Sequence, residues 1–153
     1  MDIGLSGADL ITRFDTTLFK TKFACEIKDY DPTKFGIDRK EERKLDRFTQ
    51  YAFIASAQAV ADSSIDMEIE NPDRIGVILG TGIGGIETLF QEIMGYCEGG
   101  NVPRFSPFLI PKMIPDIAPG MIAMKYGFRG PNYTTVSACA SSTHAMIDAF
   151  NTI

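Results

Sequence analysis

Cys139 is the residue whose type and position most clearly permit covalent chemistry. It follows Tyr133–Val136, a β-branched and aromatic run that predicts a short buried strand. From Ala140 onward a helix is predicted, because apolar residues recur along one face: Ala145, Met146, Ala149 and Phe150. A helix N-terminus favours a thiolate, and open backbone N–H groups there stabilise an oxyanion when a thioester carbonyl is attacked. The alternative, which the local pattern leaves open, is a small buried apolar cysteine.

A glycine-rich turn is the second feature with chemical meaning. Ile75–Leu79 is a continuous apolar run of strand length, and Gly80–Gly85 leads from it into a helix predicted over Ile86–Tyr96. The first, third and sixth residues of the turn satisfy the G-x-G-x-x-G pattern of dinucleotide sites. That fingerprint also needs a second strand after the helix, whereas the next segment here is rich in proline. The alternative is that the glycines let the backbone pack closely beside a cavity.

A basic, amphipathic helix is predicted from Asp38 to about Asp62. Asp38 is a suitable N-cap, and Glu41 completes a capping-box pattern. One face is predicted to be buried, with apolar residues at helical spacing: Leu45, Phe48, Ala52, Ala55 and Ala59. The first turns mix basic and acidic residues, which is typical of a solvated face with pairs four residues apart. The functional alternative is a docking patch for an acidic partner.

The remaining segments predict shorter elements. Phe23–Ile27 has the composition of a short strand, and residues 1–37 show no clear opening strand. Residues 103–120 contain five prolines and predict an apolar loop with short helical turns. A helix is predicted over Met121–Tyr126, ending at Gly127 as its C-cap.

Composition excludes several classes of function. The chain has 153 residues with 44% hydrophobic residues, which is enough for one soluble domain. A net charge of −5 argues against nucleic acid as the main partner. Three cysteines and one histidine, without a CxxC pattern, predict neither a disulfide scaffold nor a metal site. No segment has the pattern of a membrane span or a signal peptide, and the cysteines are sparse, so we expect a cytoplasmic protein in a reducing compartment. We also expect no cofactor.

Several stretches together resemble one family. They occur in the family's order: Ile11–Asp15, Arg39–Tyr51, Gly80–Gly85, Ser106–Phe108, Tyr126–Asn132 and Ser137–Ala145. The sequence resembles the N-terminal part of type II β-ketoacyl-acyl carrier protein synthases, the condensing enzymes of fatty-acid biosynthesis. The resemblance implies an α/β fold of the thiolase-like kind, with αβαβα layers and two similar halves that each hold a five-stranded mixed sheet. Residues 1–153 would then form an N-terminal domain that is incomplete at both ends.

The resemblance also implies roles for individual residues. Cys139 matches the nucleophile that takes the acyl chain from its carrier as a thioester, before malonyl-acyl carrier protein is decarboxylated and condensed with it. The backbone N–H of Cys139 would be one oxyanion donor, and Ile83 would line the acyl pocket and influence chain length. The basic positions that would face the acidic acyl carrier protein are Lys40, Arg43, Lys44 and Arg104. The strand over Tyr133–Val136 would pair two subunits of a homodimer, with neither nucleic acid nor membrane as a partner.

Parts of the family's machinery have no match here. Two catalytic histidines, an essential lysine and a second oxyanion donor belong to the family's second half, so these 153 residues alone are not expected to complete condensation. The last helix shows no stop signal, which favours a piece of a longer protein. His144 stands five residues after Cys139, about 140° around a helix, and cannot replace the histidines. A non-catalytic partner subunit that shapes chain length is the alternative, although such subunits typically lack the cysteine.

Overall fold

The computed structural model describes residues 4–153, which divide into two units at residues 31 and 32. In the first unit, β1 (Ala8–Leu10) and β2 (Phe23–Cys25) form an antiparallel hairpin with Ala8 opposite Cys25. Beyond β1 the hairpin is closed by Thr12, whose hydroxyl donates to the Glu26 carboxylate at 2.8 Å. The strand predicted over Phe23–Ile27 is therefore present, although it ends two residues earlier.

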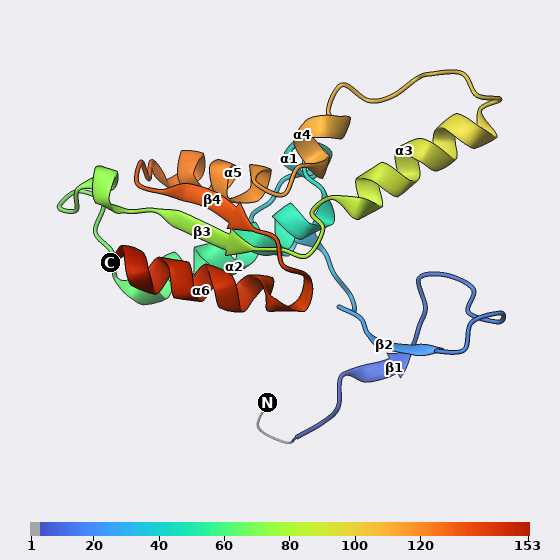
Figure 1. The fold of residues 1–153 in the computed structure, drawn as a ribbon, viewed down its shortest axis with the longest axis horizontal. Coiled ribbons are helices and arrows are strands. Elements are labelled where there is room, and N and C mark those ends of the chain that lie inside the picture. The colour runs from blue at the N-terminus through green and yellow to red at the C-terminus, as the bar shows by residue number, and fades with distance from the viewer. Residues whose placement is uncertain (1–3) are drawn as a thin grey trace. The chain divides into compact units, whose positions relative to one another are not determined.

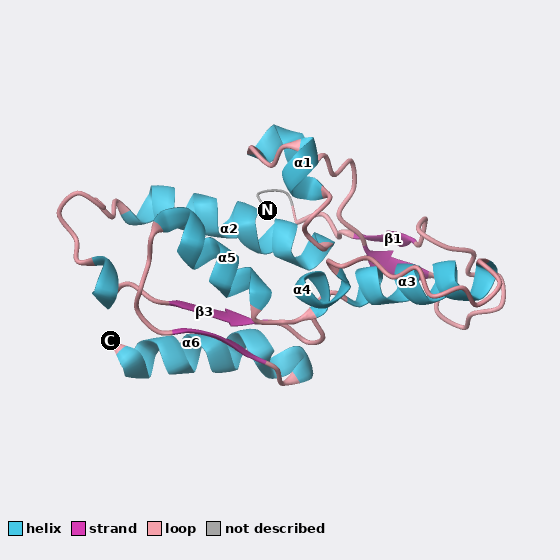
Figure 2. Ribbon diagram, turned by 90° about the horizontal axis from the view of Figure 1, so that it is seen from above, coloured by secondary structure: helices cyan, strands magenta, loops and turns pink. Residues whose placement is uncertain are grey.

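The second unit is built on a parallel pair of strands. β3 (Val77–Gly80) and β4 (Asn132–Thr135) run side by side, and Gly80 lies opposite Thr135. Helix α6 (Ser141–Thr152) covers one face of this pair, and α5 (Ile117–Tyr126) covers the other (Figure 1). Helix α2 (Arg47–Ser63) packs on the outer side of α5 (Figure 2). These layers place both strands between helices.

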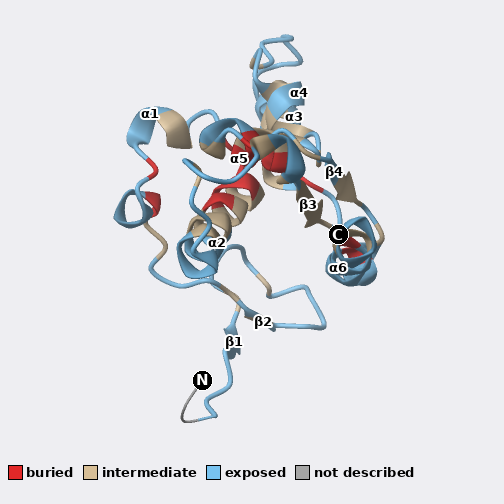
Figure 3. Ribbon diagram, turned by 90° about the vertical axis from the view of Figure 1, so that its left-hand side faces the viewer, coloured by how far each residue is buried: buried red, intermediate tan, exposed pale blue. Residues whose placement is uncertain are grey.

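The hydrophobic core lies between α2 and α5. Its buried side chains are Ile37, Leu45, Phe53 and Ile122, and Figure 3 shows the buried segments of these two helices facing each other. The face predicted for the last helix is only partly correct, because Ala145 is buried whereas Met146 and Phe150 are 65% and 80% exposed. The core therefore forms on the α5 side of the sheet, and α6 contributes little to it.

The single helix predicted from Asp38 to Asp62 is wrong. The structure has two helices there, α1 (Arg39–Glu42) and α2, separated by a break at residues 43–46. Asp38 caps α1 as predicted, by accepting from the N–H groups of Lys40 and Glu41, and Asp46 caps α2 in the same way. Leu45 lies in this break and is 3% exposed, so its predicted burial is confirmed although it belongs to neither helix.

The predicted buried face of α2 is also wrong in its later part. Ala55 and Ala59 are exposed, whereas the buried residues are Thr49, Gln50 and Phe53. Because α2 begins at Arg47 behind its own cap, the packing against α5 selects a face that includes polar residues. Periodicity of apolar residues alone points to the alanines, since they are the most numerous apolar side chains there.

The remaining helices match the predictions more closely. α3 spans Ile86–Glu98, and the short α4 (Leu109–Met113) lies in the proline-rich segment, as expected. α5 begins four residues before the predicted start, since Pro119 is tolerated in a first turn where its missing N–H needs no partner. It ends at Gly127, whose φ of 72° is the left-handed conformation expected of a C-cap. Within residues 4–153, no helix has the length and apolarity needed to cross a bilayer.

Candidate active site

Because β3 and β4 are parallel, the loops that follow them begin at the same end of the sheet. The glycine loop, residues 80–85, follows β3, and the turn that carries Cys139 follows β4. Beyond the last pair of the ladder, the Thr81 N–H still donates to the Thr135 carbonyl at 3.2 Å. A Cβ placed on Gly82 would lie 3.8 Å from the Ala138 Cα, so the two loops are in contact. The structure therefore brings the loop of Ile83 beside the turn of Cys139.

The residue before Cys139 has an uncommon backbone conformation. Ala138 has a φ of 49°, a left-handed conformation that costs an ordinary L-residue roughly 1–2 kcal/mol. Ser141 closes this turn: its hydroxyl accepts from the Ser137 N–H at 2.8 Å and donates to the Ala138 carbonyl at 2.7 Å. The Thr135 hydroxyl donates in turn to the Ser141 carbonyl at 2.8 Å. Ser141 is 2% exposed, so one buried hydroxyl holds the turn.

Cys139 is exposed at this turn, so the interpretation of a buried structural cysteine is wrong. It is the middle residue of a 3-10 turn, Ala138–Ala140, that leads directly into α6. The first hydrogen bond of that turn is from the Ala140 N–H to the Ser137 carbonyl at 3.0 Å. The N–H of Cys139 precedes it and has no acceptor inside the turn. Cys139 thus combines an accessible thiol with a backbone N–H that is not bonded within the turn.

His144 contacts the first part of the same turn and not Cys139. Its Nδ1 lies 2.8 Å from the Ser137 hydroxyl, and the side chain is exposed on α6. His144 is thus a residue of the helix surface. Because the imidazole contacts Ser137 rather than Cys139, the geometry gives His144 no role as the nucleophile's base.

The glycines are explained by close backbone approaches. A Cβ on Gly80 would collide with the Ser141 carbonyl, and one on Gly85 would collide with the Lys112 carbonyl. Such approaches leave no room for a side chain at either position. The segment after α3 forms a loop and the short α4 instead of a second strand. The packing alternative for this motif therefore accounts for its glycines.

Three of the N–H groups that a pyrophosphate could use at the start of α3 already have acceptors. The Gly85 N–H donates to the Met113 carbonyl at 3.0 Å, and the Ile86 N–H donates to the Gly84 carbonyl at 2.9 Å. The Thr88 N–H donates to the Asp46 carboxylate at 2.9 Å. A dinucleotide site relies on free N–H groups at this helix N-terminus. The first turn of α3 has bound a carboxylate of its own chain instead.

Ile83 stands in the middle of the glycine loop and is 65% exposed. The loop begins at the end of β3, and its last residue, Gly85, is held by the hydrogen bond to Met113. An exposed apolar side chain in a loop that touches the cysteine turn fits a position on the wall of an apolar pocket. The second wall of such a pocket is not formed by the described residues.

The four predicted docking residues lie at the surface around α1 and α3. Lys40 is on α1, Arg43 and Lys44 follow it, and Arg104 belongs to the loop after α3; all four are exposed. None of the four forms an ion pair with another residue of the described range 4–153. Other basic residues of this region form surface ion pairs, as the alternative of a solvated face predicts. Arg39 pairs with Glu42 at 3.2 Å, and Arg47 pairs with Glu87 at 3.5 Å.

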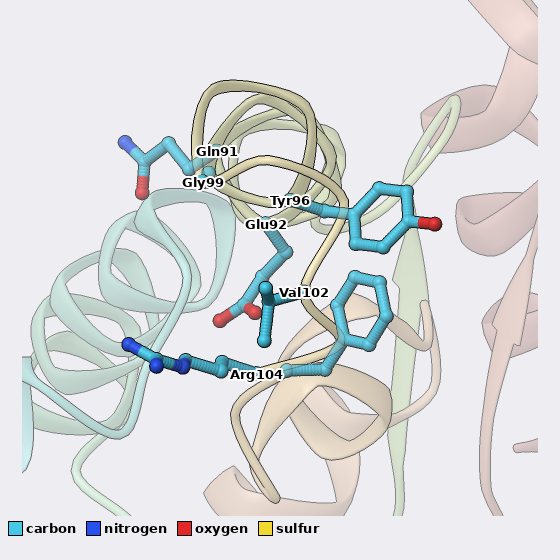
Figure 4. Close-up of a pocket in the computed structure, with 8 residues that line it drawn as sticks. Gln91, Glu92, Tyr96, Gly99, Val102 and Arg104 are labelled. Atoms are coloured by element: carbon cyan, nitrogen blue, oxygen red, sulfur yellow. The ribbon is translucent and has the colours of Figure 1, made fainter.

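Two of these basic residues lie on neighbouring hollows of the surface. Arg104 lines a hollow between α3 and its following loop, in which Tyr96 stacks on Phe105 with ring centroids 5.5 Å apart. Figure 4 shows the Arg104 guanidinium directed away from the Tyr96 ring. Arg43 lines a second hollow between α2 and α3, and Gln91 contributes to both. Gln91 of α3 therefore lies between the hollow lined by Arg43 and the hollow lined by Arg104.

Three residues with clear structural roles were missed by sequence reasoning. Ser141 holds the cysteine turn, whereas Asp46 and Thr88 join α2 to α3. Asp46 is a residue type that favours the N-cap, so a helix start at Arg47 could have been predicted. It was missed because one continuous helix was predicted through this position. Thr88 and Ser141 carry no comparable signal, since their partners are remote in sequence or belong to a turn of unpredictable conformation.

Comparison with known proteins agrees with this geometry. The family model described as beta-ketoacyl synthase, N-terminal domain, matches residues 6–153. The 3-oxoacyl-[acyl-carrier-protein] synthase 2 of Staphylococcus aureus is 42% identical over 150 residues, which is 98% of this chain and 37% of that protein. The protein of the same name from Synechocystis is 43% identical over 98% of this chain and 36% of its own length. The chain thus spans little more than a third of these relatives.

Solved structures show the same fold. The ishigamide ketosynthase/chain length factor matches 88% of this chain and 33% of its own with a TM-score of 0.72 and 29% identity. The type II polyketide ketosynthase of the AntDE:AntF complex matches 83% of this chain and 36% of its own with a TM-score of 0.74 at 24% identity. Both are thiolase-like ketosynthases, so the predicted fold class is confirmed. Residues 6–153 therefore belong to the β-ketoacyl synthase family and form its N-terminal domain.

Proposed function

We propose that this chain is the nucleophile-bearing part of a β-ketoacyl-acyl carrier protein synthase of fatty-acid biosynthesis. The observation that carries the proposal is the exposed Cys139 in a strand-to-helix turn beside the glycine loop. The names of the curated relatives support the substrate class, since both are 3-oxoacyl-[acyl-carrier-protein] synthases.

The first step proposed for Cys139 is acyl transfer. Its thiolate attacks the carbonyl carbon of an acyl thioester, and a tetrahedral oxyanion forms. The backbone N–H of Cys139 and the N-terminal dipole of α6 stabilise the negative charges before and after attack. The bond to the carrier's sulfur then breaks, the carrier leaves as a thiolate that takes a proton, and the acyl group remains on Cys139.

The second step, decarboxylative condensation with malonyl-acyl carrier protein, is assigned to the complete protein. Loss of carbon dioxide leaves a carbanion that attacks the acyl-Cys139 thioester, and the Cys139 thiolate is the leaving group. The only histidine of the chain, His144, contacts Ser137 and does not face this chemistry. The histidines implied by the family resemblance would supply the missing catalytic groups.

Acyl carrier protein is the proposed macromolecular partner. Lys40, Arg43, Lys44 and Arg104 support this, since they are exposed and have no intramolecular ion pair within residues 4–153. Arginine and lysine on a surface steer the approach of an acidic partner. We propose Ile83 as the residue of this chain that limits the length of the acyl group.

A homodimer in the cytoplasm is proposed for the complete protein. Among the described residues, β4 pairs only with β3 and leaves its other edge free, which supports pairing with a second copy. The three cysteines are free in the structure, which is compatible with a reducing compartment. Light scattering of the complete protein should give the mass of two chains, and a monomer would refute the dimer.

The test of the proposed function is condensation with and without the nucleophile. The complete protein should form a 3-oxoacyl product from acyl and malonyl carrier proteins, and Cys139→Ala should abolish it. The 153-residue chain alone should form no carbon–carbon bond. Activity that survives Cys139→Ala would instead favour the non-catalytic, chain-length-shaping subunit.

A further inference from the structure

Asp46 is a buried carboxylate that the proposed reaction does not use. It is 4% exposed, and Oδ1 accepts from the Phe48 N–H at 3.2 Å, as an N-cap of α2. Oδ2 accepts from both the N–H and the hydroxyl of Thr88, at 2.9 and 2.6 Å. Thr88 is 5% exposed and lies 42 residues away in sequence. One carboxylate therefore joins the first turns of two helices.

Capping alone does not account for this arrangement. Asp38 caps α1 with local bonds only, to the N–H groups of Lys40 and Glu41, and it is exposed. Burying a carboxylate costs free energy unless hydrogen bonds and favourable dipoles compensate it. At Asp46 that compensation comes from the N-termini of both α2 and α3, whose dipoles favour negative charge. The burial is explained by the connection between the helices.

The hydrogen bonds between Asp46 and Thr88 lie close to the glycine loop. Thr88 is the third residue of α3, and the glycine loop with Ile83 immediately precedes that helix. The same junction is also fixed by the Gly85 N–H, which donates to the Met113 carbonyl at 3.0 Å. The nearby Arg47–Glu87 ion pair has side chains that are 38% and 42% exposed. Because solvent screens such a pair, it contributes less to holding α2 against α3 than Asp46 does. The Asp46 carboxylate and the Met113 carbonyl therefore both hold the junction between the glycine loop and α3.

We infer that Asp46 is a positioning residue for the acyl pocket. Its carboxylate fixes the first turn of α3, and through it the placement of Ile83 beside the Cys139 turn. It also lies two residues after Lys44, so the same bond ties the proposed docking segment to the pocket loop. The consequence for chain-length selectivity rests on the proposed function, whereas the positioning of the loop does not.

The first test is hydrogen exchange of the complete protein, followed peptide by peptide over residues 4–153. Asp46→Asn keeps an N-cap for α2, because asparagine caps as well as aspartate, but it removes the charged acceptor of Thr88. Exchange of the amides at residues 81–89 should rise about tenfold or more, as expected for loss of bonds to a charged group. Exchange in α5 and in α6 should stay unchanged. Asp38→Asn, the matched change at a cap with local bonds only, should leave residues 81–89 unaffected.

Variants of Thr88 keep the inference testable if Asp46→Asn does not fold. Thr88→Val removes the hydroxyl and leaves the α2 cap intact, and it should loosen residues 81–89, whereas Thr88→Ser should restore wild-type exchange. The double variant Asp46→Asn/Thr88→Val should exchange no faster than Asp46→Asn. A uniform rise over the whole chain, no rise, or additive effects would overturn the positioning role.

The second test separates this inference from the proposed function. Loading of Cys139 by hexanoyl and dodecanoyl thioesters is compared in the wild type, Asp46→Asn and Asp38→Asn. A shift in the ratio of the two rates with Asp46→Asn alone is the expected result. Loading with an unchanged ratio would overturn the link from Asp46 to the pocket. No loading of the wild type would count against the proposed function, and the exchange experiment would still decide whether Asp46 positions the loop.

Discussion

At the residue scale, the turn of Cys139 depends on one neighbouring hydroxyl. Ser141 bonds the N–H of Ser137 and the carbonyl of Ala138, on both sides of a left-handed residue. Local strain of this kind persists only where surrounding contacts over-determine it. The buried Ser141 hydroxyl thus stabilises the strained turn that presents Cys139 at the surface, and it makes no contact with substrate in the proposed reaction.

Ser141→Ala should destabilise the chain and slow the reaction of Cys139. Loss of the hydroxyl leaves the Ser137 N–H without its partner, whereas the Ala138 carbonyl keeps the hydrogen bond from the Ser141 backbone N–H. The expected cost is about 1 kcal/mol. Urea unfolding gives the stability change, and the rate of acylation gives the effect on Cys139. Ser142→Ala, at the exposed neighbouring serine, is the control and should change neither. Equal effects of the two variants would contradict this role of Ser141.

Ile83→Phe should alter which acyl chains are accepted without altering stability. Its side chain is 65% exposed, and substitutions at such sites usually change stability by no more than about 0.5 kcal/mol. A larger side chain in an apolar pocket wall should reduce loading of long acyl groups by about tenfold relative to short ones. Rates with thioesters of increasing length measure this. Ile86→Phe, at a half-exposed residue of the adjacent helix, should have no such length dependence.

The chemistry-bearing residues were predictable from sequence to different degrees. Cys139 and the glycines were found because small residues and strand–helix boundaries leave local patterns. The contact between their loops follows from the parallel register of β3 and β4, which no local pattern contains. The acyl-pocket role of Ile83 came from the family resemblance alone. Asp46 and Thr88 escaped because their bond spans 42 residues.

At the element scale, the site depends on how closely β3 approaches α6. The backbone of Gly80 lies against the first residues of that helix, because a Cβ there would collide with the Ser141 carbonyl group. This approach sets the position of the cysteine turn relative to the glycine loop. Packed interiors accommodate no extra atom at such a point without movement of the backbone.

Gly80→Ala should therefore destabilise the fold by about 1–3 kcal/mol. Gly120→Ala is the matched control: a Cβ added there would have nothing within 4 Å, and alanine in a helix should stabilise by about 0.5–1 kcal/mol. Chemical denaturation of the two variants gives both values. A Gly80→Ala chain as stable as the wild type would mean that β3 and α6 are less tightly packed than in this structure.

Most elements were predictable, and the failures have tertiary causes. The helices after residue 80 follow local periodicity and capping, so they were found within a few residues. The break between α1 and α2 was missed because Leu45 and Asp46 are compatible with a helix in isolation. What ends the helix there is the burial of both residues, one in the core and one against α3.

At the scale of the whole molecule, charge must act locally. The chain carries 20 acidic and 15 basic residues, so its overall field repels an acidic carrier. Interactions between exposed charges are screened beyond a Debye length of about 10 Å at 0.1 M salt. In the proposed docking, an acidic carrier would therefore sense the basic residues around α1 more strongly than the net charge. The thiolase-like class and the four basic residues were predictable from the family resemblance. Their exposure and their lack of ion pairs within residues 4–153 required the folded structure.

Reversing charge at Arg43 and Lys44 should weaken carrier binding. Arg43→Glu/Lys44→Glu is expected to raise the dissociation constant by about tenfold or more, because two attractions become repulsions. Calorimetry with acyl carrier protein at two salt concentrations measures the change. Arg74→Glu, an exposed arginine on the segment before β3, is the control of equal residue type and should have little effect. Equal loss with both proteins would contradict docking at residues 43 and 44.

The most direct measurement of the central claim is acylation of the three cysteines. Cys25, Cys97 and Cys139 are all exposed, so accessibility alone would label them equally. The chain is incubated with a medium-length acyl thioester at neutral pH, digested, and mapped by mass spectrometry. We predict an acyl adduct on Cys139, with Cys25 and Cys97 unmodified. Equal labelling of the three, or labelling of none, would contradict the claim that the strand-to-helix turn activates Cys139.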